Sequence, residues 1–402
     1  MNGVAVLSPP PHIDYHSSMP GAYILGIESS CDETAAAVVR SGEQVISNVV
    51  ASQIATHQPY GGVVPELASR EHLRAIVPVV RQALSEAKQT YQSVDAIAVT
   101  QGPGLAGALL VGISYAKALA FVLEKPMIAV NHLEGHIHAV LLEERQKDNR
   151  ELQFPVLALV VSGGHTHLYL AEQKDNGWTY ENIGHTRDDA AGEAFDKVAK
   201  LIGLGYPGGP IVDRLATYGD PEAVKFQPAQ IKHRDRRDRK GKKQAHWDRP
   251  RFDFSYSGIK TAVLRYVEVH GMRDSIEMRR KALAKIAKPK LEDYVANCDR
   301  KTLDLVASFQ RAIVQDLVGK TLEAVRSHNA ATLFVTGGVA ANSELREAFE
   351  GDGAQEGVQV YFPSRGLATD NAAMIAAAAY PKFLRKDFAA MDFSAEASLV
   401  LR

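Results

Sequence analysis

The sequence predicts an α/β fold of two related lobes that face each other across a central cleft. Strand-like apolar runs alternate with helical stretches along most of the 402 residues, which is the pattern of an α/β protein. One series of elements occurs twice in the same order: strand, polar turn and strand, then strand, glycine turn and helix, then strand and helix. This repetition indicates an internal duplication, and the chain length suits two domains of roughly 150 residues or more.

The first copy of the series occupies residues 21–153. It follows a polar, proline-containing stretch, residues 1–20, which we expect to be disordered. Strands are expected where apolar residues continue without interruption, and turns where glycine or polar residues interrupt them. In chain order the elements are the strand Ala22–Glu28, the turn Ser29–Thr34, the strands Ala35–Val39 and Val94–Thr100, the turn Gly102–Gly104, the helix Leu105–Leu123, the strand Met127–Val130 and a helix that contains His132, His136 and His138.

The second copy occupies residues 154–392 and is followed by a C-terminal tail, residues 393–402. It differs from the first copy by an insertion at about residues 182–300. Its elements are the strand Val156–Val161, the turn Ser162–Thr166, the strands His167–Ala171 and Thr332–Thr336, the turn Gly337–Gly338, a helix from about Asn342, the strand Val358–Phe362 and a helix from about Asp370. Because polar turns of both lobes can converge on the cleft between them, the cleft is the expected ligand site.

Composition and charge limit the class of protein. Lys and Arg number 46 and Asp and Glu number 47, so the surface as a whole is not basic, although a net charge does not reveal local patches. Two cysteines, Cys31 and Cys298, exclude a disulfide framework and a zinc site built mainly of thiolates. A reducing, cytoplasmic compartment is expected.

No membrane partner is expected. Residues 1–20 lack the basic and apolar regions of a signal peptide. Leu105–Leu123 is long enough to raise the question of a membrane span. However, it follows a Gly-Pro-Gly turn and contains Gly107, Gly112 and Lys117, which favours burial inside the fold.

Three turns carry groups that bind ligands. Hydroxyl and backbone N–H groups of Ser29–Thr34 can hold phosphate oxygens, and Asp32 and Glu33 can hold a cation or orient water. In Ser162–Thr166 two glycines allow close approach of a ligand to the backbone. In Gly337–Asn342 a glycine pair allows a base or sugar to lie against the backbone, with a helix N-terminus nearby. Taken alone, each turn is equally well an ordinary hairpin or strand–helix connection.

His132 and His136 are a candidate metal-binding pair. At positions i and i+4 of a helix the two imidazoles share one face. The intervening glutamate is displaced by one place from the HExxH pattern of metallopeptidases. A third ligand is required, and Asp370 is the best candidate because it occupies, in the second copy, the place of His132 in the first. Two histidines and a carboxylate suit iron(II), zinc or manganese, whereas an isolated histidine pair is more often structural.

The insertion carries two further features. Its first part contains Asp196 and Asp213 beside the rigid loop Tyr206–Pro210, and these carboxylates could bind a ribose or an amino-acid moiety; helix-surface charges are the simpler alternative. Its second part, Lys225–Arg251, contains eleven Lys and Arg against three Asp and Glu. Phosphate backbones attract such segments in a salt-dependent way, although a single charge run is more often a solvated loop.

Eight segments together resemble the motifs of the bacterial tRNA N6-adenosine threonylcarbamoyltransferase family, formerly described as O-sialoglycoprotein endopeptidases. They occur in the family's order over about Tyr23–Ala379. The segments are GIESSCDETAAAVV, VTQGPGLAGALLVG, NHLEGHIHA, VVSGGHTHL, GEAFDKVAKLIGLGYPGGP, FSYSGIKTAV, VTGGVAAN and ATDNAAMIA. The resemblance implies the duplicated actin/Hsp70/sugar-kinase (ribonuclease H-like) fold, in agreement with the two predicted lobes.

The resemblance also implies a reaction and partners. The donor would be threonylcarbamoyl-AMP, and its threonylcarbamoyl group would move to N6 of the adenosine beside the anticodon, position 37, in tRNAs that read codons beginning with adenine. AMP would leave. Family members act with a catalytically inert paralogue of the same fold and with a small P-loop ATPase.

By the same resemblance, the family's site residues correspond to defined positions of this chain. The metal ligands would be His132, His136 and Asp370, which hold iron(II), with zinc as the alternative. Acidic positions near the metal match Asp32 and Glu33, candidates for proton transfer. The donor contacts would be Val160, Val161, Ser162, Gly163, Gly164, Asp196, Gly209, Asp213 and Asn342.

Two positions depart from the wider family. Archaeal and eukaryotic relatives have a tyrosine metal ligand where this chain has Val160, and valine cannot coordinate a metal. The basic segment Lys225–Arg251 is also longer than expected of a bacterial member, so no role is implied for it.

Three other functions remain possible on the residues alone. The histidine pair permits a metallopeptidase, although no glutamate is placed to activate a metal-bound water. The phosphate-binding turns permit a small-molecule kinase or ATPase. A non-catalytic subunit of a larger assembly is the third alternative.

Overall fold

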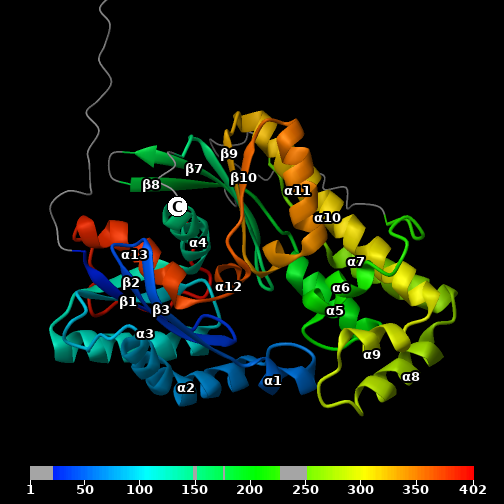
Figure 1. Cartoon of the computed structure of the whole chain (residues 1–402), viewed down its shortest axis with the longest axis horizontal. Helices are drawn as coiled ribbons and strands as arrows, with labels where there is room; N and C mark the ends of the chain where they lie inside the picture. Colours follow the sequence, from blue (N-terminus) through cyan, green and yellow to red (C-terminus); the bar gives the residue numbers. More distant parts are fainter. Residues whose placement is uncertain (1–20, 148–151, 175–176, 227–250) are drawn as a thin grey trace, which may run out of the picture.

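The computed structural model describes residues 21–147, 152–174, 177–226 and 251–402. It contains two five-stranded sheets with helices around them (Figure 1). The strands of the first sheet are β1 (Tyr23–Glu28), β2 (Glu33–Arg40), β3 (Gln44–Ser52), β4 (Ala96–Gly102) and β5 (Met127–Asn131). Those of the second sheet are β6 (Val156–Val161), β7 (Thr166–Lys174), β8 (Gly177–His185), β9 (Thr332–Thr336) and β10 (Gln359–Tyr361).

The two sheets have the same topology, which confirms the predicted duplication. The strand order is β3-β2-β1-β4-β5 in the first sheet and β8-β7-β6-β9-β10 in the second. In each sheet the first three strands form an antiparallel meander. The fourth strand pairs in parallel with the first, and the fifth pairs in parallel with the fourth. The parallel strands place their carboxyl ends, and therefore their following turns, at one edge of each sheet.

Helices cover both faces of the first sheet. Helices α2 (Pro65–Glu86) and α3 (Ala106–Leu123) pack on one face with Leu25 and Ile27 of β1. The opposite face packs against α13 (Ala372–Leu384), through residues such as Ile24 of β1. Because alternate residues of a strand point to opposite faces, the short run Ile24–Ile27 contributes to both cores. A helix from the end of the chain thus completes the core of the first lobe.

Helix α4 (His132–Lys147) lies between the two sheets (Figure 1). Leu133 and Ile137 of α4 share an apolar cluster with Val156, Ala158 and Val160 of β6. The side chain of Thr336 on β9 also donates to the carbonyl oxygen of His136 at 2.9 Å. The helix that carries both candidate histidines is therefore fixed by contacts with both lobes.

The second lobe carries its helices on the other face of its sheet, around α10 (Arg300–His328). The inserted region contributes a group of helices that extends to one side of the molecule (Figure 1). The remaining helices are α1 (Ile54–His57), η1 (Gln58–Tyr60), α5 (Ala191–Leu201), α6 (Gly208–Ala216), α7 (Ser257–Val269), α8 (Arg273–Leu283), α9 (Leu291–Ala296), η2 (Gly338–Ala341), α11 (Ser343–Gln355) and α12 (Arg365–Ala368).

Helix α3 is the one helix in the described ranges that is long and apolar enough to cross a membrane by length and composition. Its residues Leu109, Ile113 and Ala116 are buried in the core of the first lobe against β1 and β4. The expected burial therefore holds for one face of the helix only, because Leu110, Phe121 and Val122 on its other side are exposed.

The C-terminal tail lies against the first lobe. The backbone N–H of Glu396 donates to the carbonyl oxygen of Gln101 at 3.0 Å. Near the end of the chain, Leu401 is buried in the cluster between α4 and β6. The predicted disordered stretch, residues 1–20, lies outside the described residues, and so does most of the basic segment Lys225–Arg251.

Candidate active site and metal centre

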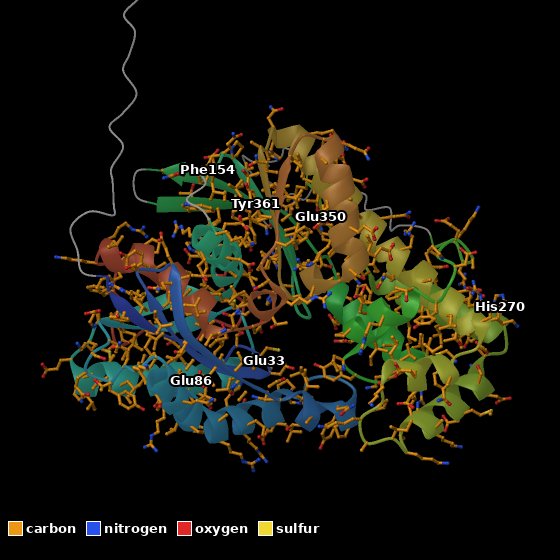
Figure 2. All side chains as sticks on the ribbon, in the orientation of Figure 1. Glu33, Glu86, Phe154, His270, Glu350 and Tyr361 are labelled. Carbon is orange, nitrogen blue, oxygen red and sulfur yellow. The ribbon has the colours of Figure 1, made fainter. Side chains whose placement is uncertain are left out.

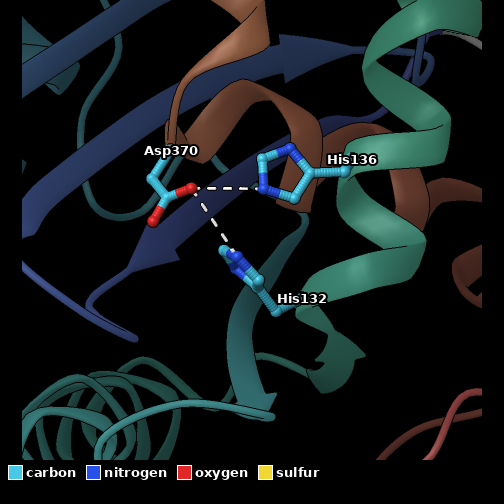
Figure 3. Close-up of side chains that lie close together, drawn as sticks. All are labelled: His132, His136 and Asp370. Carbon is cyan, nitrogen blue, oxygen red and sulfur yellow. Dashed lines mark ion pairs between the residues drawn. The ribbon is translucent and has the colours of Figure 1, made fainter. Parts of the chain in front are cut away.

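His132, His136 and Asp370 meet at one point, where the start of α4 faces the loop before α13 (Figure 3). The two histidines come from the first turns of α4, and Asp370 comes from the loop before α13. The Oδ1 atom of Asp370 lies 3.2 Å from Nε2 of His136 and 3.6 Å from Nε2 of His132. Possible ligand atoms of the three side chains lie within 4.8 Å of one another, so the group could hold one metal ion.

The surroundings of these side chains fit a metal site. Among the described residues, neither ring nitrogen of the fully buried His136 has a partner with hydrogen-bond geometry. A buried polar atom without a hydrogen bond is costly, and a metal ion bound at Nε2, which faces Oδ1 of Asp370, would satisfy that atom. A donor set of two imidazoles and one carboxylate suits iron(II), zinc or manganese.

Charge also favours a cation at this point. Burial alone would raise the pKa of Asp370, but His132 and His136 hold this pKa well below its usual range. Burial would likewise lower the pKa of His132, but Asp370 and Glu28 raise it to about 9. The carboxylates thus stabilise positive charge at the cluster, whether a proton or a metal ion carries it.

The acidic turn after β1 lies beside the cluster. Glu33 begins β2 on the side of the first lobe that faces α5 and α6 (Figure 2), and its Oε1 accepts a hydrogen bond from Ser52 at 2.9 Å. Burial, Asp32 and Asp370 together raise the pKa of Glu33 to about 9. The raised pKa favours the protonated form of Glu33.

Asp32 reaches towards the other lobe. Its Oδ2 accepts a hydrogen bond from the phenol of Tyr206, in the loop before α6, at 3.4 Å. The side chain of Lys200 on α5 likewise donates to the carbonyl oxygen of Tyr60 at 2.8 Å. These two contacts join the two lobes near the acidic turn.

The glycine turns of the second lobe are adjacent in space. Gly337 has a φ of 93°, and a Cβ atom there would lie 2.4 Å from the carbonyl oxygen of Val161. The turn after β9 thus packs against the end of β6. Gly163 and Gly164 are exposed, and no atom lies within 4 Å of the position that a Cβ would take at either residue. This leaves room for a ligand against the backbone.

The structure places the other predicted donor contacts as follows. Val160 and Val161 are fully buried in β6, and Val160 packs with Ile137 of α4. Ser162 is buried at the end of the strand, where its backbone N–H donates to the carbonyl oxygen of His165. The two valines can therefore meet a ligand only through the backbone at the strand end.

Asp196 and Gly209 belong to one local structure. The Oδ1 atom of Asp196 on α5 accepts a hydrogen bond from the backbone N–H of Gly208 at 2.6 Å. Burial raises the pKa of Asp196 to about 6. Gly209 has open space at its Cβ position. Asp196 thus holds the start of α6, and the open backbone beside it remains accessible.

Asp213 and Asn342 both stabilise the start of α11. Asp213 accepts hydrogen bonds from the backbone and hydroxyl of Ser343, at 3.0 and 2.7 Å. Asn342 caps the helix by accepting from Leu345 N–H at 2.9 Å, and its amide nitrogen donates to Gln310 at 2.8 Å. The side chains of Asp213 and Asn342 therefore have hydrogen-bond partners within the protein, in addition to any contact with the donor substrate.

Sequence reasoning missed Glu28 and Tyr206. Glu28 is fully buried beside His132, and Tyr206 contacts Asp32 across the cleft. A glutamate at the end of an otherwise apolar strand was the available signal for Glu28. No local pattern distinguishes Tyr206, because its partner is 174 residues away in the chain.

The fold and the site define the class of protein first. Two duplicated lobes with these sheets form the actin/Hsp70/sugar-kinase type of fold, with a possible metal centre in the cleft. A solved structure of full-length HypF in its phosphate- and nucleotide-bound form is similar in fold, with a TM-score of 0.52 and 14% identity over 90% of this chain and 46% of HypF. A component of (R)-2-hydroxyglutaryl-CoA dehydratase from Acidaminococcus fermentans aligns with a TM-score of 0.46 and 13% identity, over 90% of this chain and 98% of that one.

The family follows from the sequence comparisons. The profile of the tRNA N6-adenosine threonylcarbamoyltransferase family matches residues 44–377. Proteins of that name are 70% identical over 384 residues in Koribacter versatilis and 51% identical over 365 residues in Syntrophobacter fumaroxidans. These alignments cover 96% and 91% of this chain, and 100% and 95% of the relatives. The chain belongs to the tRNA N6-adenosine threonylcarbamoyltransferase family, and it is therefore an enzyme.

Proposed function

We propose that the chain transfers the threonylcarbamoyl group of threonylcarbamoyl-AMP to N6 of adenosine 37, beside the anticodon, in tRNAs that read codons beginning with adenine. AMP is the leaving group. The observation that carries this proposal is the meeting of His132, His136 and Asp370 beside the acidic turn. Glycine turns open to a ligand at the end of β6 support it.

The chemistry is acyl transfer from a mixed anhydride to an amine. Adenosine N6 is a weak nucleophile because its lone pair is delocalised into the purine. Catalysis therefore depends on positioning the amine against the carbamoyl carbon and on removing a proton as the bond forms. Neither task requires a covalent intermediate on the protein.

His132, His136 and Asp370 would hold the metal ion, iron(II) most readily and zinc as the alternative. When bound, such an ion supplies Lewis-acid polarisation of donor oxygens and a template for their arrangement. Three protein ligands leave coordination positions for the substrate. The valine at position 160 fits this arrangement, because its buried side chain adds no fourth ligand.

The remaining residues position the donor and move the proton. Backbone groups of Val161–Gly164, with Val160 behind them in β6, hold the threonylcarbamoyl or phosphate part. The adenylate lies along the Gly337–Asn342 turn and the open backbone at Gly209. Asp196 and Asp213 hold the helix starts that form this surface. Since the raised pKa of Glu33 favours its protonated form, Asp32 is the better candidate to accept a proton from the amine.

The partners and location are part of the proposal. The substrates are tRNA and threonylcarbamoyl-AMP, and the reaction takes place in the cytoplasm. An inert paralogue of the same fold and a small P-loop ATPase assist, as in the family that the sequence resembles.

One experiment tests the reaction. The purified chain is incubated with synthetic threonylcarbamoyl-AMP and an unmodified tRNA transcript, with and without the two partner proteins, and the nucleosides are analysed by mass spectrometry. We expect threonylcarbamoyladenosine with adenosine at position 37 and none when guanosine replaces it. We expect the product to disappear after chelation and to return with iron(II) or zinc. Full transfer by metal-free protein would refute the metal assignment, and absence of product with every partner and metal would refute the proposed donor.

A further inference from the structure

We propose that Glu28 is a positioning residue that orients His132 for metal binding. Glu28 is the last residue of β1 and is fully buried. Its Oε2 atom lies 3.0 Å from Nδ1 of His132. The inference rests on the proposed metal site and adds to it a carboxylate that does not itself coordinate the metal.

Three hydrogen-bond donors converge on the Glu28 carboxylate. The backbone N–H of Ser30 donates to Oε1 at 2.5 Å, the hydroxyl of Thr100 donates to Oε2 at 2.7 Å, and the ring of His132 faces Oε2. Ser30 lies in the turn two residues after the end of β1, and Thr100 lies on the neighbouring strand β4. The turn after β1 and the neighbouring strand β4 therefore both hold the carboxylate, in addition to its contact with the imidazole.

The contact selects one tautomer of His132. When Nδ1 donates its hydrogen to Glu28, the lone pair of the neutral ring lies on Nε2. That atom faces Asp370, 3.6 Å from its Oδ1. A carboxylate behind a ligating histidine fixes the ring orientation and increases its basicity. The hydroxyl of Ser30, 3.2 Å from Nδ1, is a second group on the same side of the ring.

The other histidine has no such support. Within the described part of the chain, Nδ1 of His136 has no hydrogen-bond partner. The two metal ligands on α4 are therefore held differently. A carboxylate holds His132 at Nδ1, behind the metal-binding nitrogen, while His136 meets a carboxylate at Nε2, where Asp370 lies 3.2 Å away.

Replacing Glu28 with glutamine would break this arrangement. A glutamine side chain has nearly the same shape, but it offers one acceptor oxygen and an amide group that only donates. It cannot accept from the Ser30 N–H, the Thr100 hydroxyl and the His132 ring in the present geometry. At least one of these donors would lose its partner in a buried site.

The test measures metal binding by the metal-free full chain. Zn²⁺ affinity is determined by competition with a chelator, and Co²⁺ is used as a spectroscopic probe of ligand geometry. We expect Glu28→Gln to weaken Zn²⁺ binding by about 10- to 100-fold and to alter the Co²⁺ absorption bands. The matched control is Glu86→Gln on the exposed face of α2, which should bind both ions as the wild type does.

The outcomes separate the two proposals. If Glu28→Gln is folded and binds Zn²⁺ as tightly as the wild type, Glu28 has no positioning role. If His136→Ala also binds like the wild type, the metal site itself is wrong. Should Glu28→Gln fail to fold, Thr100→Val answers the question, because it leaves the carboxylate in place and removes one group that orients it. Several-fold weaker Zn²⁺ binding by Thr100→Val supports the role, and unchanged binding refutes it.

Discussion

Asp32 and Glu33 are neighbours in the chain but differ in their surroundings. Glu33 is mostly buried near Asp32 and Asp370, and its pKa rises to about 9. It also accepts a hydrogen bond from Ser52. Asp32 instead accepts from Tyr206 across the cleft. Since the raised pKa favours the protonated form of Glu33, we propose the base role for Asp32 and a structural or proton-donating role for Glu33.

This assignment predicts unequal effects of two isosteric substitutions. Asp32→Asn should lower kcat for threonylcarbamoyl transfer by about 100-fold or more, the range of general-base catalysis. Glu33→Gln should lower it by less than about 10-fold, because an amide resembles the protonated acid. Initial rates at saturating donor, followed by mass spectrometry, measure both effects. Thermal melting of each variant provides the folding control, and the opposite order of effects would contradict the assignment.

Individual site residues differ in how well the sequence predicts them. The spacing of His132 and His136 depends only on helix geometry, and the place of Asp370 follows from the duplication, so both could be predicted. The contacts of Asp213 with Ser343 and of Asn342 with Gln310 could not, because they join segments far apart in the chain. The same is true of Glu28, whose partner His132 is 104 residues away.

At the scale of elements, the turn after β9 depends on a glycine. Gly337 has a positive φ, and its Cα lies so close to β6 that a Cβ would be 2.4 Å from the Val161 carbonyl oxygen. The adjacent Gly338, in η2, has nothing within 4 Å of its Cβ position. Only the first glycine of the pair is therefore required for the close approach of the two turns.

The pair provides a matched test. Gly337→Ala should lower the free energy of unfolding by roughly 2 kcal/mol or more, because strain in φ and a backbone clash occur together. Gly338→Ala should change it by less than about 0.5 kcal/mol. Urea unfolding of the two variants gives both values. Equal losses in the free energy of unfolding would mean that the close approach to Val161 does not disfavour a Cβ atom at position 337.

The limits of element prediction have a physical cause. Buried strands such as β1 and β6 are continuous apolar runs and could be located closely. The edge strands β3 and β8 were not predicted, because they are only partly buried and contain polar residues throughout. The helices predicted from about Asn342 and Asp370 begin at Ser343 and Ala372, each after an asparagine N-cap.

At the scale of the whole molecule, the two lobes share elements. Helix α13 follows the second sheet in the chain but packs on the first, with Ile24 and Ala37 in one cluster. Its Lys382 also pairs with Glu134 of α4 at 3.1 Å. The sequence predicted two lobes because each copy of the repeat has its own strands. The sequence could not predict that α13 packs on the first sheet. The helix is apolar like any buried helix, and no local pattern indicates which sheet it contacts.

Charge is the other property of the whole molecule. Lys225–Arg251 has a local net charge of +8, from eleven basic and three acidic residues, whereas the whole chain has −1. The rest of the chain therefore carries −9. An acidic body repels tRNA, so we expect the basic segment to provide much of the attraction to the phosphate backbone. Residues 227–250 lie outside the described residues, and this prediction rests on charge alone.

Neutralising part of the segment tests its role. Changing Arg234, Arg236, Arg237 and Arg239 to glutamine should raise the Kd for tRNA and reduce the slope of log K against log salt by up to about 3, since each phosphate contact contributes about 0.7 to 0.9. Binding is measured at several salt concentrations with the chain alone. The matched control changes four exposed cations of the first lobe, Arg70, Arg74, Arg81 and Lys88. Both variants lose four positive charges, so equal effects would reveal only a response to net charge. A larger loss in the first variant would locate the tRNA contact in the insertion, while unchanged binding there would make the segment a solvated loop.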